Sequence, residues 1–289
     1  MATDDEPPSN DERMDERMSA AAERERITQW SGLAQQYDAH RPAGPAILPP
    51  LLAQLAEAPR PALVVDLGCG TGLSTLLWAD AAQQVIGVEP NDDMRQQAER
   101  RLAHERPDAS HIRFIGTTAQ QTSLPDGCAD IVTASQAFHW MEPTTTLAEI
   151  ARILRHGGIF AAYDYQWPPT ITWRTDTLFH DFMDRAFEIA ESRGYGAIPP
   201  SWDKAGHLER MRASGQFRQV KEIALHNVEP CDADRFIGMS MSNTIEWMLA
   251  RGEVTADEIG LDAFERAARE ALPMPTRWYV SYHVRLGLK

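Results

Sequence analysis

An apolar run that leads directly into three closely spaced glycines limits what this chain can become more than any other feature. Residues 64–75 read Val-Val-Asp-Leu-Gly-Cys-Gly-Thr-Gly-Leu-Ser-Thr, so that Asp66 stands just before Gly68, Gly70 and Gly72. This order is typical of a strand, a tight turn and a helix. Glycine reaches positive φ and lets a ligand approach the backbone where a Cβ would clash. The segment therefore predicts a nucleotide-type site at the end of a strand.

The spacing of the loop narrows the class of ligand. Dinucleotide loops follow Gly-x-Gly-x-x-Gly/Ala, whereas the third position counted from Gly68 is Leu73, and the anionic Asp66 precedes the turn. A P-loop needs a lysine after its glycines, and none follows here. The loop thus disfavours a diphosphate and excludes a P-loop. A nucleoside without phosphates remains, one whose cationic end tolerates a nearby carboxylate.

A second apolar run supplies another carboxylate. Residues 85–88 read Val-Ile-Gly-Val and end in Glu89. In a doubly wound sheet this places Glu89 at the carboxyl end of a neighbouring strand, where its oxygens can accept hydrogen bonds from two ribose hydroxyls. Asp66 and Glu89 therefore bracket the predicted nucleoside site.

These segments resemble the class I S-adenosylmethionine-dependent methyltransferases over about residues 30–165. Besides the glycine loop, the likeness rests on Val-Ile-Gly-Val-Glu-Pro-Asn-Asp-Asp-Met at 85–94, on residues 114–127, and on the runs at 129–135 and 153–160. The resemblance implies S-adenosylmethionine as cofactor, S-adenosylhomocysteine as product, and in-line methyl transfer. In one departure, Thr118 stands where many relatives carry an acid. The cofactor-binding residues so implied are Tyr37, Arg41, Asp66, Gly68, Gly70, Gly72, Glu89, Pro90, Met94, Thr118, Ala119 and Ser135.

Candidates for acceptor chemistry follow the fourth and fifth predicted strands. Ser-Gln-Ala-Phe-His-Trp at 135–140 is similar to the branch of small-molecule enzymes that includes trans-aconitate methyltransferase. His139 titrates near neutrality and can take a proton from an acceptor or bind its carboxylate, or it can simply pack on Trp140. We therefore name His139 and Asp164 as catalytic candidates. The acceptor-binding candidates are His139, Trp140, Tyr165 and Trp167.

The hydrophobic pattern predicts an α/β fold with a doubly wound, mostly parallel, seven-stranded sheet of the Rossmann-like methyltransferase type. Alternation of helices with nearly continuous apolar strands is typical of a parallel sheet covered on both faces. The predicted strands are 62–67, 84–88, 111–115, 129–135, 158–164, 217–229 and 276–288. The predicted helices are 73–82, 92–105, 144–154, 232–250 and 256–271.

Composition divides the chain further. We expect a disordered acidic tail at 1–22, an N-terminal helical cap at 23–60 and the cofactor-binding core at 61–165. The aromatic segment 166–216 is predicted to be a helical lid near the substrate, and 217–289 to complete the sheet.

Charge and cysteine content limit the partners. A net charge of −14 argues against a nucleic acid as substrate. No apolar stretch reaches about 18 residues, and the acidic start does not resemble a signal peptide, so we expect a cytoplasmic protein that binds no membrane. The three cysteines lack paired spacing, which predicts neither a metal site nor a disulfide frame. The oligomeric state is not predicted.

The acceptor remains open at this point: a carboxylate, a hydroxyl, an amine or an activated carbon. A second hypothesis is a protein that binds S-adenosylmethionine but has lost transfer, or uses it to assist a reaction such as cyclisation. A nicotinamide dehydrogenase is disfavoured by the loop spacing.

Overall fold

The computed structural model describes residues 24, 26–28, 31–32, 40–195, 201–242 and 244–289. Tyr37 and the predicted acidic tail at 1–22 lie outside these described residues.

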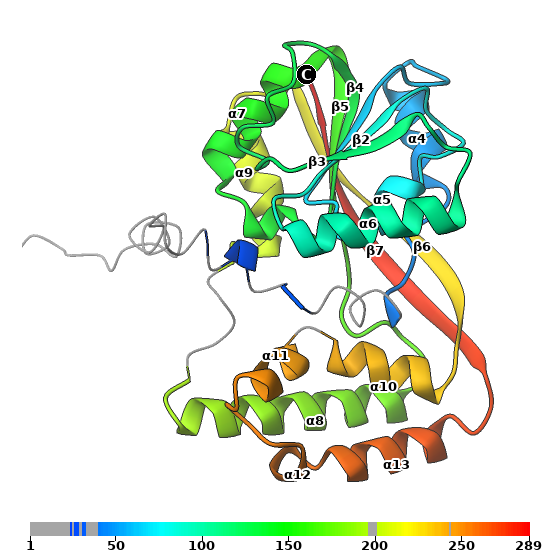
Figure 1. The fold of residues 1–289 in the computed structure, drawn as a ribbon, viewed down its shortest axis with the longest axis vertical. Helices are drawn as coiled ribbons and strands as arrows, with labels where there is room; N and C mark the ends of the chain where they lie inside the picture. Colours follow the sequence, from blue (N-terminus) through cyan, green and yellow to red (C-terminus); the bar gives the residue numbers. More distant parts are fainter. Residues whose placement is uncertain (1–23, 25, 29–30, 33–39, 196–200, 243) are drawn as a thin grey trace, which may run out of the picture.

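Seven strands form one mixed sheet in the order β3-β2-β1-β4-β5-β7-β6 (Figure 1). Strands β1 to β5 are parallel to one another, and β7 is antiparallel to both β5 and β6. The strand order reverses between β1 and β4, and ligands bind at such a switch point beyond the carboxyl ends of the strands. The predicted Rossmann-like fold is confirmed. The strands are β1 (Val64–Leu67), β2 (Val85–Val88), β3 (Ile112–Ile115), β4 (Ala129–Ser135), β5 (Leu154–Tyr165), β6 (Gln219–Cys231) and β7 (Thr276–Leu288).

Alternate residues of the central strands enter two hydrophobic cores, one on each face of the sheet. Val64 belongs to one core, with Leu52 of α4 (Leu48–Leu55) and Trp78, while Val65 belongs to the other, with Leu147 of α7 (Pro143–Ile153). All four residues of β1 are buried. Burial on both faces explains why this strand reads as an unbroken apolar run.

Two further helices connect the parallel strands. Helix α5 (Leu73–Leu76) follows the glycine loop, and turns replace the rest of the helix predicted at 73–82. Helix α6 (Asp92–Glu105) matches its prediction, and the Asn91 side chain accepts a hydrogen bond from Met94 N at 3.0 Å, which caps the helix.

A separate layer of helices lies beyond the carboxyl ends of the parallel strands, and the long strands β6 and β7 reach down to it (Figure 1). Phe182 and Phe264 stack there with ring centroids 4.2 Å apart. The layer draws on both segments 166–216 and 217–289. Its helices are α8 (Trp173–Ser192), α10 (Ala233–Met241), α11 (Thr244–Ala250), α12 (Ala256–Ile259) and α13 (Leu261–Ala271).

The structure interrupts two predicted helices. The span 232–250 is divided into α10 and α11, and the span 256–271 into α12 and α13. Gly260 separates the second pair with φ +71°, a left-handed conformation that ends a helix. Closer to the sheet, η2 (Lys204–Gly206) leads into α9 (His207–Ala213). No helix among the described residues has both the length and the apolarity that a membrane span requires.

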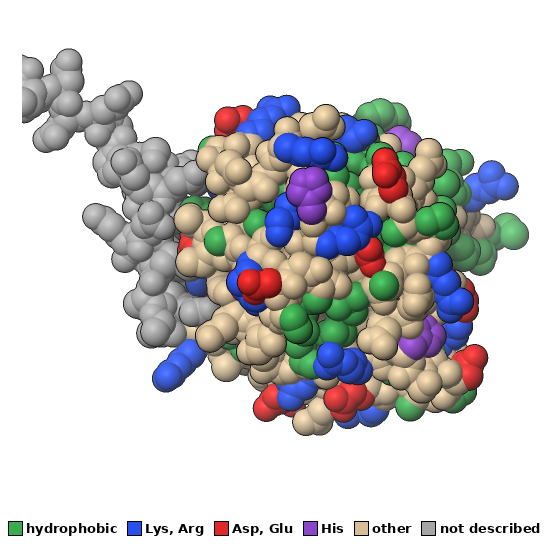
Figure 2. Space-filling model, turned by 90° about the horizontal axis from the view of Figure 1, so that it is seen from above, with side chains coloured by type: hydrophobic (Ala, Val, Ile, Leu, Met, Phe, Trp, Pro, Cys, Tyr) green, Lys and Arg blue, Asp and Glu red, His purple; other side chains and the backbone are tan. Residues whose placement is uncertain are grey.

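Figure 2 views the end of the molecule at which β7 finishes, opposite the carboxyl ends of the parallel strands. Lysine and arginine side chains gather there, with acidic side chains interspersed among them. The candidate site lies at the other end of the sheet.

Candidate cofactor and acceptor site

A cavity opens at the carboxyl ends of β1, β2 and β4. About 1170 Å³ of space free of protein atoms lies in it, part of which is open to solvent. The loop after β1, the start of α6, the turn at 118–120 and the loop after β4 supply most of its wall. Its lining also includes Arg26, Ile27, Arg41, Pro42 and Gly44 from the N-terminal segment, and Tyr165 and Tyr282 from β5 and β7.

The three glycines of the loop have different roles. Gly68 and Gly70 line the cavity with φ of +61° and +53°, and a Cβ on Gly70 would have only Met94 Cε, at 3.7 Å, within 4 Å. Gly72 does not line the cavity. A Cβ there would lie 3.1 Å from both Ala98 Cβ and Phe114 Cζ. Its predicted cofactor contact is therefore replaced by a packing role against α6 and β3.

Asp66 is fully buried beneath the loop and does not line the cavity either. Its carboxylate accepts hydrogen bonds from Ser74 Oγ at 2.6 Å, Thr75 Oγ1 at 2.8 Å and Thr133 Oγ1 at 2.8 Å. Burial raises the pKa of Asp66, and these three hydroxyl donors oppose the rise. The predicted role of Asp66 thus reduces to tying the glycine loop to α5 and β4.

Glu89 faces the cavity with its carboxylate held by backbone amides. Gly70 N donates to Oε2 at 3.0 Å and Asn91 N donates to Oε1 at 2.8 Å. Burial raises the pKa of Glu89, and the two amide donors lower it. Each carboxylate oxygen has two lone pairs, so both can accept a further hydrogen bond from a ligand. The backbone donors also fix the direction in which those lone pairs point.

Most of the remaining predicted cofactor residues reach the same cavity. The predicted cofactor residues that line it are Arg41, Pro90, Met94, Thr118, Ala119 and Ser135. Sequence reasoning assigned no role to several others that also line it. These are Cys69, Thr71, Leu73, Ser74, Gln120, Gln136, Ala137 and Met141. Residues next to them in the sequence had been predicted to bind the cofactor. The sequence therefore identified the loops that form the wall but not each residue in them.

Two of the four predicted acceptor residues, Trp140 and Tyr165, line the cavity. Arg41 Nη1 donates a hydrogen bond to Tyr165 OH, and the Arg41 guanidinium carbon lies 5.4 Å from the ring centroid of Trp167. Trp167 itself lines a smaller apolar cavity beside Phe179 instead. No described residue between 166 and 216 lines the main cavity; α8 of this segment belongs to the helical layer, and η2 and α9 lie closer to the sheet.

Tyr282 was missed, although the sequence holds a signal for it. Trp278, Val280, Tyr282 and Val284 alternate along β7, and all four are buried. The alternation therefore places Tyr282 on the inward face, and its hydroxyl donates to Ala43 O at 2.6 Å.

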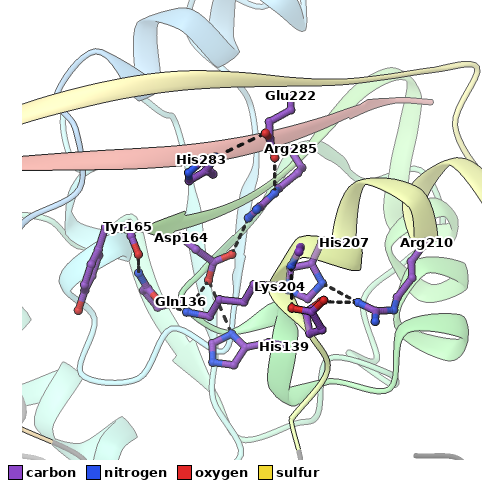
Figure 3. Close-up of polar contacts among 12 residues, drawn as sticks. Gln136, His139, Asp164, Tyr165, Lys204, His207, Arg210, Glu222, His283 and Arg285 are labelled. Carbon is purple, nitrogen blue, oxygen red and sulfur yellow. Dashed lines mark hydrogen bonds and ion pairs between the residues drawn. The ribbon is translucent and has the colours of Figure 1, made fainter. Parts of the chain in front are cut away.

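The two predicted catalytic residues lie together, but not in the cavity wall (Figure 3). His139 Nδ1 is 3.6 Å from Asp164 Oδ1, and Arg285 Nη1 donates to Asp164 Oδ2 at 3.0 Å. Burial, helped by the charges of Lys204, His207 and Arg41, lowers the pKa of His139 well below its usual value. His139 is therefore neutral near pH 7 and part of a buried polar cluster.

Gln136 connects that cluster to the cavity. It adopts φ +50° after β4, its backbone N donates to Tyr163 O at 2.9 Å, and its side chain lines the cavity. Lys204 Nζ donates to Gln136 Oε1 at 2.7 Å and lies 3.3 Å from Asp164 Oδ1. No sequence motif around Lys204 could have identified it as a neighbour of the site. Among the described residues, no group of three or more His, Cys, Asp or Glu side chains could hold a metal ion.

The sequence and the fold were compared with those of known proteins. The sequence profile of a methyltransferase domain matches residues 65–162. These residues form a methyltransferase domain. The resemblance to class I S-adenosylmethionine-dependent methyltransferases is thereby confirmed, whereas the trans-aconitate branch remains a prediction.

The similar proteins carry related names. The probable S-adenosylmethionine-dependent methyltransferase CRG1 of Saccharomyces cerevisiae is 32% identical over 133 residues, which cover 46% of this chain and 45% of that protein. The uncharacterized methyltransferase YcgJ of Bacillus subtilis is 30% identical over 119 residues, covering 41% of this chain and 46% of that one. The matches thus span less than half of these relatives.

Among solved structures, a putative type II methyltransferase from Anaeromyxobacter dehalogenans superposes with a TM-score of 0.63 at 24% identity, covering 86% of this chain and 98% of that one. The YcgJ structure superposes with a TM-score of 0.50 at 19% identity, covering 83% of this chain and 97% of that one. These likenesses show that the fold is shared.

Proposed function

We propose that this protein transfers a methyl group from S-adenosylmethionine to a small organic acceptor. The observation that carries the proposal is the Glu89 carboxylate, held by the amides of Gly70 and Asn91 beside a glycine loop, within a methyltransferase domain. The printed name of the yeast relative supports the same cofactor.

The cavity residues fit this cofactor in chemistry and in order. Glu89 accepts from the ribose hydroxyls, while Met94, Thr118 and Ala119 lie where the adenine would pack. Because Gly70 has no side chain, its backbone leaves space for the cofactor that a side chain would otherwise fill. Arg41 suits the carboxylate of the methionyl part because its forked donors match a carboxylate.

Bound S-adenosylmethionine supplies a methyl group on a positively charged sulfur, and that charge disappears on transfer. The protein then has to position the acceptor in line and exclude water. Trp140, Tyr165 and Tyr282 offer aromatic walls for this purpose, and Gln136 offers a fixed side-chain amide. Lys204 donates to Oε1 of Gln136, and the amide nitrogen of Gln136 donates one hydrogen to Tyr165 O at 3.5 Å, so its second hydrogen can be donated to a ligand.

The lining also favours one kind of acceptor. Glu89 is the single carboxylate among the lining side chains that the structure describes, and it belongs to the ribose end. His139 and Asp164 do not line the cavity, so neither is in place to remove a proton. An acceptor that is already nucleophilic, such as a carboxylate, needs no general base. We therefore favour an acceptor oxygen that carries negative charge.

Calorimetry with S-adenosylhomocysteine tests the cofactor, and release of S-adenosylhomocysteine from S-adenosylmethionine tests transfer. The acceptor panel should contain organic acids, phenols and amines of similar size. We expect binding by the wild-type protein and turnover with members of the acid group. Binding of a dinucleotide in place of S-adenosylhomocysteine would overturn the proposal. Binding with cofactor left intact while a substrate is converted would favour the cyclisation-type alternative.

A further inference from the structure

Residues 40–44, which we call the strap, form the part of the cavity wall that carries Arg41. The strap lies outside the matched domain and is fastened to the C-terminal part of the chain. Ala43 N donates to Glu229 Oε1 at 2.9 Å, and Arg235 Nη2 donates to Arg41 O at 3.2 Å. Tyr282 OH and Asn227 Nδ2 both donate to Ala43 O, at 2.6 and 3.3 Å. The backbone on both sides of Pro42 is thus held by β6, β7 and α10.

Glu229 and Arg235 are the centre of this attachment. They form an ion pair with side chains only 13% and 21% exposed. The Arg235 guanidinium carbon lies 4.8 Å from the ring centroid of Trp278, and its Nη1 donates to Pro230 O at 2.7 Å. Asn227 Nδ2 donates to Glu229 Oε1 at 2.8 Å. Each charged group therefore has several fixed partners, which gives the pair one geometry.

A close contact on α10 holds the other end of the strap. A Cβ built on Gly238 would lie 2.2 Å from His40 Cδ2, so the imidazole packs directly on the backbone of the helix. Gly238 does not have a positive φ and stands inside a regular helix. Glycine costs about 1 kcal/mol relative to alanine at such a position, so this glycine is explained by the contact with His40.

We propose that the Glu229–Arg235 pair is a positioning clasp for Arg41. The pair fixes the strap backbone, and the strap in turn fixes where the Arg41 guanidinium meets the cavity, beside Tyr165. Through this clasp β6 and α10, which contribute no described side chain to the cavity, govern recognition of the carboxylate at the amino-acid end of the cofactor. The inference rests on the proposed function, because that carboxylate belongs to S-adenosylmethionine.

Two related ligands separate the clasp from a general effect on the fold. S-adenosylhomocysteine carries the amino-acid end, whereas 5′-methylthioadenosine has the same nucleoside and thioether without it. We expect R41M, R235M and E229A each to bind S-adenosylhomocysteine at least tenfold more weakly and 5′-methylthioadenosine within twofold of wild type. R269Q, which removes an exposed ion pair between α13 and Asp234 of α10, is the matched control and should change neither affinity.

A second pair of variants tests the same idea without removing a charge. G238A introduces a Cβ against His40 and should selectively weaken S-adenosylhomocysteine binding, while H40A/G238A should restore it. If R235M or G238A weakens both ligands equally, or neither, the clasp is refuted. Failure of the wild-type protein to bind S-adenosylhomocysteine would instead overturn the proposed function, and the clasp with it. Circular dichroism on every variant identifies any that does not fold.

Discussion

The ammonium of Lys204 lies 2.7 Å from Gln136 Oε1 and 3.3 Å from Asp164 Oδ1, so one side chain joins a cavity-lining amide to a buried carboxylate (Figure 3). Arg285 extends the connection, since its Nη1 donates to Asp164 and its Nε donates to Glu222 at 2.7 Å. A continuous set of polar contacts therefore runs from the cavity to the sheet edge at β6. The two catalytic candidates, His139 and Asp164, belong to this set of contacts, which reaches the cavity through Gln136.

Substitution of Arg285 should be among the most destabilising single changes in the molecule. The side chains of Arg285 and Asp164 are 7% and 5% exposed, so R285M leaves a buried carboxylate with fewer partners. We expect the free energy of unfolding to fall by about 3–5 kcal/mol, the usual cost of breaking a buried pair. Denaturant unfolding at pH 7 measures it.

The comparison for that measurement is R269M, which breaks the exposed Arg269–Asp234 pair. Solvent screens exposed pairs and leaves them little net stabilisation, so this variant should stay close to wild type. Equal losses in R285M and R269M would mean that the cluster around Asp164 adds no special stability.

The fold was largely readable from the sequence because the central strands are apolar on both faces. Strand β4 has the predicted bounds 129–135, and β2 and β3 begin one residue later than predicted. The helices after β6 were less readable. The left-handed Gly260 interrupts a span that is otherwise periodic, and a single glycine within such a span does not reveal its φ.

The sequence locates the residues around the cavity where one local segment carries them, but it does not reveal which side chains reach the cavity where their orientation depends on distant residues. Glu89 follows its strand directly, and its amide partners lie nearby in space. His139 does not line the cavity; it lies in η1 (Phe138–Trp140), which follows Gln136 with its φ of +50°. No sequence feature around Gln136 predicts its positive φ. Lys204, which donates a hydrogen bond to the Gln136 side chain, is far away in the sequence.

Stability should depend on pH through His207. This side chain is 1% exposed, and burial together with nearby Arg285, Arg210 and Lys204 lowers its pKa to about 3. Between pH 6.5 and 3 the unfolded chain binds a proton that the native state refuses, so this group reduces stability as the pH falls. The expected slope is about 0.7 kcal/mol per pH unit at pH 6.5, where the unfolded histidine is half protonated, and approaches about 1.4 kcal/mol per pH unit at lower pH.

The variant H207F isolates that contribution, because Phe138 already packs against the ring with centroids 4.7 Å apart. Carboxylates titrate in both proteins, so their effect cancels in the comparison. Unfolding free energies should decline less steeply in H207F, by about 0.7 kcal/mol between pH 7 and 6 and by about 1.2 kcal/mol between pH 6 and 5. Parallel curves for the two proteins would contradict the assignment of a neutral buried His207.

Two glycines of the loop should separate binding from stability. Gly70 lines the cavity at φ +53°, so G70V places a branched side chain on the ligand side of a strained backbone. We expect no detectable S-adenosylhomocysteine binding by calorimetry. Gly72 faces Ala98 and Phe114 instead, so G72A should lower stability by about 1–3 kcal/mol and leave the affinity of the folded protein within about threefold. Intact binding by G70V would exclude the loop as the cofactor site.

Glu89 should contribute to affinity through its two outward lone pairs. E89A removes the carboxylate that would accept both ribose hydroxyls, and charged hydrogen bonds of this kind contribute about 1.5–3 kcal/mol. We therefore expect S-adenosylhomocysteine to bind roughly 10- to 150-fold more weakly, measured by calorimetry at constant pH. E142A is the matched control, since Glu142 also accepts from two backbone amides, those of Thr144 and Thr145, but caps α7 and does not itself line the cavity. It should lose about 1 kcal/mol of stability and no affinity. Wild-type affinity in E89A would remove the ribose contact, because no other acid among the described lining residues could replace it.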